Sequence, residues 1–153
     1  RNSHLEASSS LKNEILRHPL SLSLVHPKAY LEVVEWNHRI HQMARDISSL
    51  LTPDDTFILV DEDQFRELMA AGRRVRPFLE RDGQYWGAPP DDDTAISELE
   101  RMRALGTRFV IFAWPAFWWL EHYRGFHNYL RSRFQCALQN DRVIAFNLSL
   151  PSH

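Results

Sequence analysis

One short segment collects most of the aromatic rings that could recognise a ligand. The segment AWPAFWWLEHYRGF, residues 113–126, holds three of the chain's five tryptophans. Aromatic faces stack on the apolar faces of sugar rings, and each ring covers on the order of 150–250 Å² when buried. One side of a helix cannot bury all of these rings, so we expect some to stay exposed. Exposed rings serve either a ligand or a partner, and we favour an interface over a ligand platform because tryptophan and tyrosine are enriched at interfaces.

The predicted ligand-binding set joins this segment to a loop at residues 80–93 that is rich in glycine, proline and aspartate. Its members are Tyr85, Trp86, Trp114, Trp118, Trp119, His122 and Tyr123. They would hold a saccharide or a neighbouring domain. Arg73, Arg74 and Arg76 are candidates for phosphate or anion contacts, since guanidinium forks match phosphate and carboxylate geometry. The alternative is a charged edge strand that discourages aggregation.

Two runs of acidic residues have a structural explanation that competes with a functional one. The run 61–63 could hold a hard metal ion or accept ribose hydroxyls. Both this run and the run 91–93 precede predicted helices, where acids stabilise the N-terminus, so we interpret both as caps. Zinc would need ligands that the histidine spacing does not supply, and the single Cys136 excludes an internal disulfide. We therefore expect neither a metal nor a cofactor.

Composition and missing motifs exclude several classes of protein. A net charge of -2 disfavours a nucleic-acid partner. No apolar run approaches the roughly 20 residues of a membrane span. The chain has no G-x-G-x-x-G, Walker or G-x-S-x-G sequence, so a dinucleotide site, a P-loop or a hydrolase elbow is not expected. We assign no catalytic residue and expect a soluble, cytoplasmic chain.

The elements that position these residues begin after a polar, serine-rich start. Residues 1–27 are interpreted as a tag or linker and a loosely packed arm. Residues 28–51 form an amphipathic helix, in which Val33, Trp36, Ile40 and Met43 recur at spacings of three and four. This seam could join two copies in a homodimer. A helix lying on its own domain is the interpretation we favour.

Residues 52–150 alternate strand and helix patterns. Strands are predicted at 56–60, 73–79, 108–113, 134–139 and 142–148, and helices at 61–72, 94–105 and 117–131. Asn140 and Asp141 form a hairpin turn between the last two strands. This order predicts an α/β class: a small Rossmann-like three-layer domain with a mainly parallel sheet and a C-terminal antiparallel hairpin. Ligands in such sheets bind beyond the carboxyl ends of the strands, near 61–63, 114–119 and the long loop.

The segment ELERMRALGTRFVIFAWPAFWWLEHYRGFHNYLRSRF resembles a recurring stretch in bacterial multidomain proteins of surface-polysaccharide biosynthesis. There, an apolar strand leads into P-A-x-x-W-W-L-x-H-Y-x-G-F and a helix. Upstream, DGQYWGAPPDDD is similar to the DG-x-Y-x-G-x-x-P-x-D of those proteins, and the likeness covers about residues 55 to 148. Their usual proline is Arg124 in this chain. The resemblance implies an accessory domain beside glycosyltransferase or methyltransferase domains, without an assigned catalytic residue.

Three hypotheses follow from the sequence. The first is a non-catalytic accessory module of a glycan-assembly protein that holds a saccharide or a neighbouring domain on an aromatic surface. Its partners would be the other domains of the parent protein and a saccharide or nucleotide sugar. The second is a degenerate Rossmann-like transferase, of the glycosyl- or methyltransferase type, that takes a nucleotide-type donor at residues 61–63. The third is a dimerising structural module.

Overall fold

The computed structural model describes residues 27–70 and 72–151. Of the predicted linker and arm at residues 1–27, residues 1–26 lie outside the described residues. The described residues belong to two compact units, which divide between Gln42 and Met43. The predicted helix at 28–51 is present as α3 (Pro27–Leu50). The boundary between the units falls inside α3, so its last turns belong to the α/β unit rather than to a separate helical segment.

The unit Met43–His153 contains a five-stranded sheet with the order β2-β1-β5-β7-β6. The strands are β1 (Thr56–Val60), β2 (Arg74–Pro77), β5 (Thr107–Ala113), β6 (Phe134–Gln139) and β7 (Val143–Pro151). Strand β1 pairs in parallel with β2 and β5, whereas β7 pairs antiparallel with β5 and β6. All strands of this sheet except β7 therefore run in one direction. The predicted α/β class and mostly parallel sheet are confirmed.

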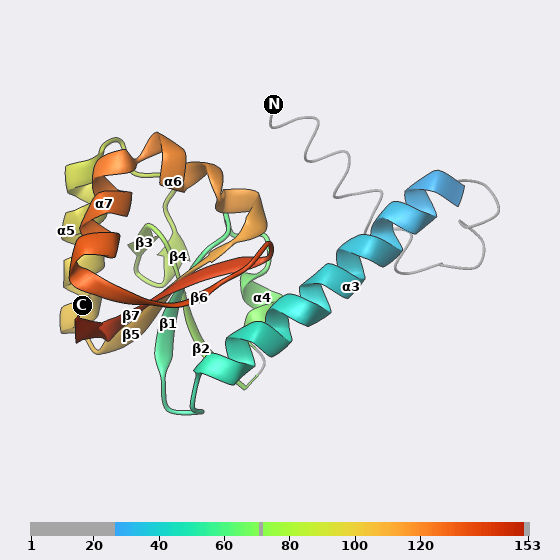
Figure 1. The fold of residues 1–153 in the computed structure, drawn as a ribbon, viewed down its shortest axis with the longest axis horizontal. Coiled ribbons are helices and arrows are strands. Elements are labelled where there is room, and N and C mark those ends of the chain that lie inside the picture. Colours follow the sequence, from blue (N-terminus) through green and yellow to red (C-terminus); the bar gives the residue numbers. More distant parts are fainter. Residues whose placement is uncertain (1–26, 71, 152–153) are drawn as a thin grey trace. The chain divides into compact units, whose positions relative to one another are not determined.

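The sheet is buried on both faces because its central strands are continuously apolar. Ile58 and Val60 of β1 belong to the main core, together with residues of α5 (Asp92–Ala104) and α7 (Arg124–Arg133). Phe57 and Leu59 are equally buried, and alternation along a strand directs them to the opposite face. Figure 1 shows α5 and α7 on one side of the sheet and α4 (Arg66–Met69) on the other. Because both faces of the sheet are covered, its residues reach solvent mainly at the ends of the strands.

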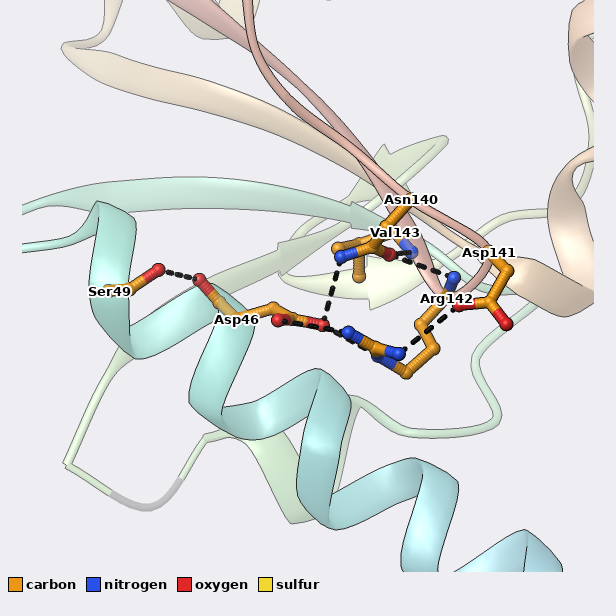
Figure 2. Close-up of polar contacts among 6 residues, drawn as sticks. All are labelled: Asp46, Ser49, Asn140, Asp141, Arg142 and Val143. Carbon is orange, nitrogen blue, oxygen red and sulfur yellow. Dashed lines mark hydrogen bonds and ion pairs between the residues drawn. The ribbon is translucent and has the colours of Figure 1, made fainter.

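The turn between β6 and β7 is fastened to the end of α3 (Figure 2). Arg142 Nε donates to Asp46 Oδ2 at 2.9 Å, and Asn140 Nδ2 donates to the same oxygen at 3.4 Å. Asn140 Oδ1 in turn accepts the backbone N–H groups of Arg142 and Val143, each at 2.9 Å. The hairpin turn predicted at Asn140 and Asp141 is confirmed. Its side chains also position the last turns of α3, where Met43 and Ile47 are completely buried.

Three predicted elements differ from those observed. The helix expected at 61–72 shrinks to α4, because Glu62 and Asp63 adopt positive φ angles of 56° and 60°. The loop 80–93 contains a small hairpin of β3 (Glu80–Arg81) and β4 (Gln84–Tyr85). The helix expected at 117–131 is broken at Tyr123, with ψ at 69°. It is replaced by α6 (Trp118–His122) and α7, and the short 3-10 helix η1 (Trp114–Ala116) precedes them.

The residues predicted to join two copies through α3 are largely covered in the single chain. Val33, Ile40 and Met43 are buried and Trp36 is half-buried. The contact between two copies through this seam stays a prediction. Among the described residues, no helix combines the length and the apolar character that crossing a bilayer requires.

Candidate functional site

The candidate site lies where the strand order of the sheet reverses. The chain passes from β1 to β2 on one side, and β5 occupies the other side of β1. Val60, the last residue of β1, pairs with Phe112, one residue before β5 ends. Asp61 and Trp114 therefore leave the sheet at the same carboxyl edge. In open α/β sheets this edge, at the reversal point, is where ligands bind.

Asp61 directly follows the last residue of β1 at this edge, and it is 2% exposed. Its Oδ1 accepts the backbone N–H of Asp63 at 2.9 Å, and its Oδ2 accepts that of Phe65 at 2.6 Å. Burial raises the pKa of Asp61 to about 6, although these two backbone hydrogen bonds act in the opposite direction. The helix α4 begins only at Arg66. Asp61 therefore binds the backbone of the loop that precedes α4 and is not the N-cap of this helix.

Glu62 connects the end of β1 to the aromatic segment. The indole Nε1 of Trp118 donates to Glu62 Oε1 at 2.8 Å. Glu62 and Asp63 both occupy the left-handed region of backbone space, which is uncommon for residues with a side chain. Backbone strain of this kind is frequent at binding and catalytic sites. The structure thus brings together two of the three places that the sequence nominated.

Tyr85 belongs to the third place that the sequence nominated, the loop at residues 80–93. Its side chain is half-buried. Burial, followed by the negative charges of Glu62, Asp61 and Asp63, raises the pKa of Tyr85 to about 12. The phenol therefore remains protonated near neutral pH and can donate a hydrogen bond. The hairpin that carries Tyr85 is attached to the start of α4, because Arg66 Nη1 donates to the carbonyl oxygen of Gly83 at 2.8 Å.

Two half-buried tryptophans supply ring surface at this edge. Trp114 lies against Phe65, with ring centroids 5.0 Å apart. Trp118 contacts His122 edge-on, with a centroid distance of 5.6 Å, and His122 itself is exposed. Trp86, next to Tyr85, is 67% exposed. We call the set of residues that meet at this edge the rim site: Asp61, Glu62, Tyr85, Trp114 and Trp118.

Trp119 and Tyr123 belong to the core, which corrects their predicted place on the binding surface. Trp119 is 0% exposed and packs against Phe78, with ring centroids 6.0 Å apart. Tyr123 is buried, and its hydroxyl donates to the carbonyl oxygen of Pro89 at 2.6 Å. The physical reason is their spacing: residues four apart lie on the same face of a helix, and the two rings pack against each other with centroids 5.2 Å apart. Neither ring is included in the rim site.

The predicted anion-binding arginines do not meet at the rim site. Arg74 pairs with Thr56 at the amino end of β1, the opposite edge of the sheet. Arg76 forms an ion pair with Glu80 at 3.0 Å. Arg73 donates to Ser48 Oγ at 2.5 Å, on α3. The structure therefore gives the side chains of Arg73 and Arg76 structural partners and does not gather the three arginines around one anion.

The second acidic run has the capping role predicted for it. Asp91 Oδ1 accepts the backbone N–H of Thr94 at 2.7 Å, at the start of α5. Asp92 goes further, since its Oδ1 accepts the backbone N–H of Phe126 in the first turn of α7 at 3.1 Å. Within residues 27–70 and 72–151, histidine, cysteine and acidic side chains form no group of three or more that could hold a metal ion.

Comparison with protein-family models, curated proteins and solved structures found no match to this chain. The fold and the rim site therefore carry the functional argument. They define an α/β domain with carboxylates, a protonated phenol and partly exposed indoles at the carboxyl edge of its sheet. The sequence did not predict that Glu62 and Trp118 are hydrogen-bonded. The available signal was the carboxyl-edge rule, which places the ends of β1 and β5 together.

Proposed function

We propose that this chain is a non-catalytic binding module that holds a saccharide at the rim site. In this proposal it is a Rossmann-like accessory domain of a bacterial glycan-assembly protein and acts in the cytoplasm. The observation that carries the proposal is the hydrogen bond between Trp118 and Glu62 at the reversal point of the sheet. It joins a carboxylate, which can accept hydrogen bonds from sugar hydroxyls, to an aromatic ring, which can stack on a sugar ring.

The chemistry of the rim site fits a neutral ligand with many hydroxyl groups. A carboxylate accepts up to about four hydrogen bonds, so Glu62 keeps acceptor capacity after it binds the indole. Tyr85 can both donate to and accept from a hydroxyl. Trp114 and Trp118 are half-buried, so part of each ring remains available to stack on a pyranose face. The acids of residues 61–63 would repel an anionic ligand, which favours a neutral saccharide.

The setting in glycan assembly depends on the resemblance of the segment PAFWWLEHYRGF to accessory domains of polysaccharide-synthesis proteins. A neighbouring domain of such a protein is the other candidate occupant. Trp86, which is 67% exposed, is suited to that contact because exposed tryptophans often anchor interfaces. Both occupants can coexist, since Trp86 lies beside the rim site in sequence without belonging to it.

A fluorescence titration tests saccharide binding. We expect neutral oligosaccharides to quench tryptophan emission saturably. Glu62→Gln removes the charged acceptor while it retains the shape, and should weaken the affinity at least about tenfold, or roughly 1.4 kcal/mol. Glu35→Gln, at an exposed position of α3, is the matched control and should bind normally. A flat response over a broad glycan panel would exclude the saccharide proposal.

A nucleotide-type donor is the second candidate, and the position of Asp61 favours it. An acid that follows the first strand at the reversal point lies where nucleotides bind in open α/β sheets. The chain lacks the glycine-rich turn that usually cradles the phosphates, which is why we rank this function second. Calorimetry with nucleotide sugars and with S-adenosylmethionine separates the two candidates. Tight binding of either compound would reverse the ranking.

A further inference from the structure

The base of the β3–β4 hairpin is held by several contacts. The backbone N–H of Trp86 donates to the carbonyl oxygen of Leu79 at 2.9 Å. Glu80, the first residue of β3, is 6% exposed and accepts hydrogen bonds from Arg76 at 3.0 Å and from Arg101 at 3.5 Å. These contacts fix the point where the hairpin leaves the core.

The tip of the hairpin has one comparable attachment. Within the ranges that the structure describes, a single hydrogen bond joins residues 82–83 to another element, and Arg66 Nη1 donates it to the carbonyl oxygen of Gly83 at 2.8 Å. Residues 81–84 are exposed, and the hairpin is a two-stranded sheet separate from the five-stranded one. A hairpin of this size has little stability of its own. The position of its tip therefore depends on Arg66.

Arg66 also holds the acidic loop that follows β1. Its Nε lies 2.8 Å from Asp63 Oδ1. Asp63 directly follows Glu62 of the rim site, and Gly83 precedes the phenol of that site, Tyr85, by two residues. One guanidinium therefore fastens together the two segments that carry the carboxylate and the phenol of the rim site.

We propose that the β3–β4 hairpin is a flap of the rim site, and that Arg66 is the positioning residue that holds this flap closed. The role of the flap rests on the proposed binding function of the rim site. When Arg66 releases Gly83, the base stays fixed and the tip turns outward, which carries Tyr85 away from Glu62. A ligand then enters the rim site, and renewed contact with Arg66 closes the flap behind it.

The two contacts of Arg66 are weak enough to break while the domain stays folded. The side chains of Arg66 and Asp63 are 23% and 34% exposed, and ion pairs in contact with water contribute little to stability. At the base, by contrast, Phe78 and Leu79 are buried in the core cluster. Segments with exposed hydrogen bonds and few buried apolar contacts open locally, and the core remains closed. The hairpin combines such a tip with a firmly packed base.

Hydrogen exchange of the full chain in increasing, non-denaturing urea tests the flap. Local opening exposes little surface, so exchange at residues 81–85 should not depend on urea, whereas exchange in β1 and β5 should rise with urea. Arg66→Ala should speed exchange at residues 81–85 about fivefold, which corresponds to about 1 kcal/mol, the upper range for an exposed ion pair. Arg131→Ala, at an exposed position of α7, is the matched control and should leave this exchange unchanged. Unchanged exchange in Arg66→Ala, or exchange at residues 81–85 that rises with urea as in β1 and β5, would overturn the proposal.

The reactivity of Tyr85 tests whether opening of the flap uncovers the rim site. Nitration by tetranitromethane requires the phenolate, and burial raises the pKa of Tyr85, so nitration should be slow while the flap is closed. Arg66→Ala should speed nitration of Tyr85 several-fold, whereas the buried Tyr123 should stay unreactive. Arg66→Lys retains the charge without the guanidinium fork and should restore part of the protection. An unchanged rate at Tyr85 in Arg66→Ala, or equal rates at Tyr85 and Tyr123, would refute the flap. Neither measurement uses a saccharide, so failure of the flap and failure of saccharide binding are distinguishable.

Discussion

Trp118 and Glu62 lie 56 positions apart in the chain, yet the indole Nε1 of Trp118 donates to Glu62 Oε1 at 2.8 Å. The bond connects the first residue of α6 to the loop that leaves β1. It therefore fixes the ring of Trp118 relative to the carboxylates at the end of β1. A ligand that stacks on this ring would meet acceptors already oriented toward it, and such preorganisation lowers the entropic cost of binding.

Replacing Glu62 separates the role of the hydrogen bond from that of the charge. Glu62→Ala removes the acceptor, and we expect the free energy of unfolding to fall by about 1 kcal/mol, the typical net value of one hydrogen bond. Glu62→Gln keeps an acceptor oxygen and should retain most of that stability. Urea unfolding followed by tryptophan fluorescence measures both changes. An equal loss in the two variants would show that the charge, and not the bond to Trp118, stabilises the fold.

Asp61 makes stability depend on pH in a predictable direction. Burial raises its pKa from 3.8 to about 6 in the folded chain. The folded state thus holds this proton more tightly than the unfolded state. The resulting contribution to stability is complete below pH 3.8 and disappears as the pH rises through about 6. A difference of two pKa units corresponds to about 3 kcal/mol.

The variant Asp61→Asn isolates this titration, because every other ionisable group is shared with the wild type. The free energy of unfolding of the wild type, minus that of the variant, should fall by about 3 kcal/mol between about pH 4 and about pH 7. Any constant effect of the amide on the backbone hydrogen bonds cancels in this comparison. Unfolding at a series of pH values gives the difference directly. A difference that is constant with pH would mean that Asp61 titrates normally in the folded chain.

The parts of the fold that the sequence predicted best are those with a local signal. The run Phe57 to Val60 is continuously apolar, and it becomes a strand buried on both faces. Gly106 follows the end of α5 and has a positive φ of 99°, as expected of a glycine that terminates a helix. The carboxyl-edge rule placed residues 61–63 and 114–119 each beyond the carboxyl end of a strand. The structure adds that the two segments are in contact, through Glu62 and Trp118.

The errors arose where tertiary contacts overrode the local pattern. Residues 117–131 carry a helical pattern, and nothing local predicts the break at Tyr123. That break is accompanied by the long-range hydrogen bond from Tyr123 to Pro89. The hairpin of β3 and β4 did have a signal, because Asp82 and Gly83 adopt the paired positive φ angles that Asp-Gly turns favour. It was missed because the flanking strands are only two residues long and not apolar.

The hydroxyl of Tyr123 holds the end of the loop at residues 80–93 in place. It donates to the carbonyl oxygen of Pro89, a buried residue, at 2.6 Å. Tyr123→Phe removes the donor and leaves a buried acceptor without this partner, which should cost about 1–2 kcal/mol of unfolding free energy. Hydrogen exchange should also become faster in residues 84–88. Unchanged exchange there would show that other contacts hold the loop in place.

Gly125 and Asp92 pack closely where the first turns of α5 and α7 meet. A Cβ atom at Gly125 would lie 2.9 Å from both Cγ and Oδ2 of Asp92, closer than atoms normally approach. Asp92 cannot withdraw freely, because its Oδ1 accepts the backbone N–H of Phe126 at 3.1 Å. Gly125 is helical and has no positive φ. Its lack of a side chain is therefore explained by Asp92 and not by backbone conformation.

This geometry predicts that the effect of Gly125→Ala on stability changes sign with the residue at position 92. In the wild-type background the new methyl group should displace Asp92 from Phe126 and destabilise the fold by about 1 kcal/mol or more. In an Asp92→Ala background the clash is gone, and alanine should stabilise α7 by up to about 1 kcal/mol through its higher helix propensity. The four variants form a double-mutant cycle that thermal or urea unfolding can complete. Additive effects would mean that α7 moves as a body to accommodate the methyl group, independently of the Asp92 carboxylate.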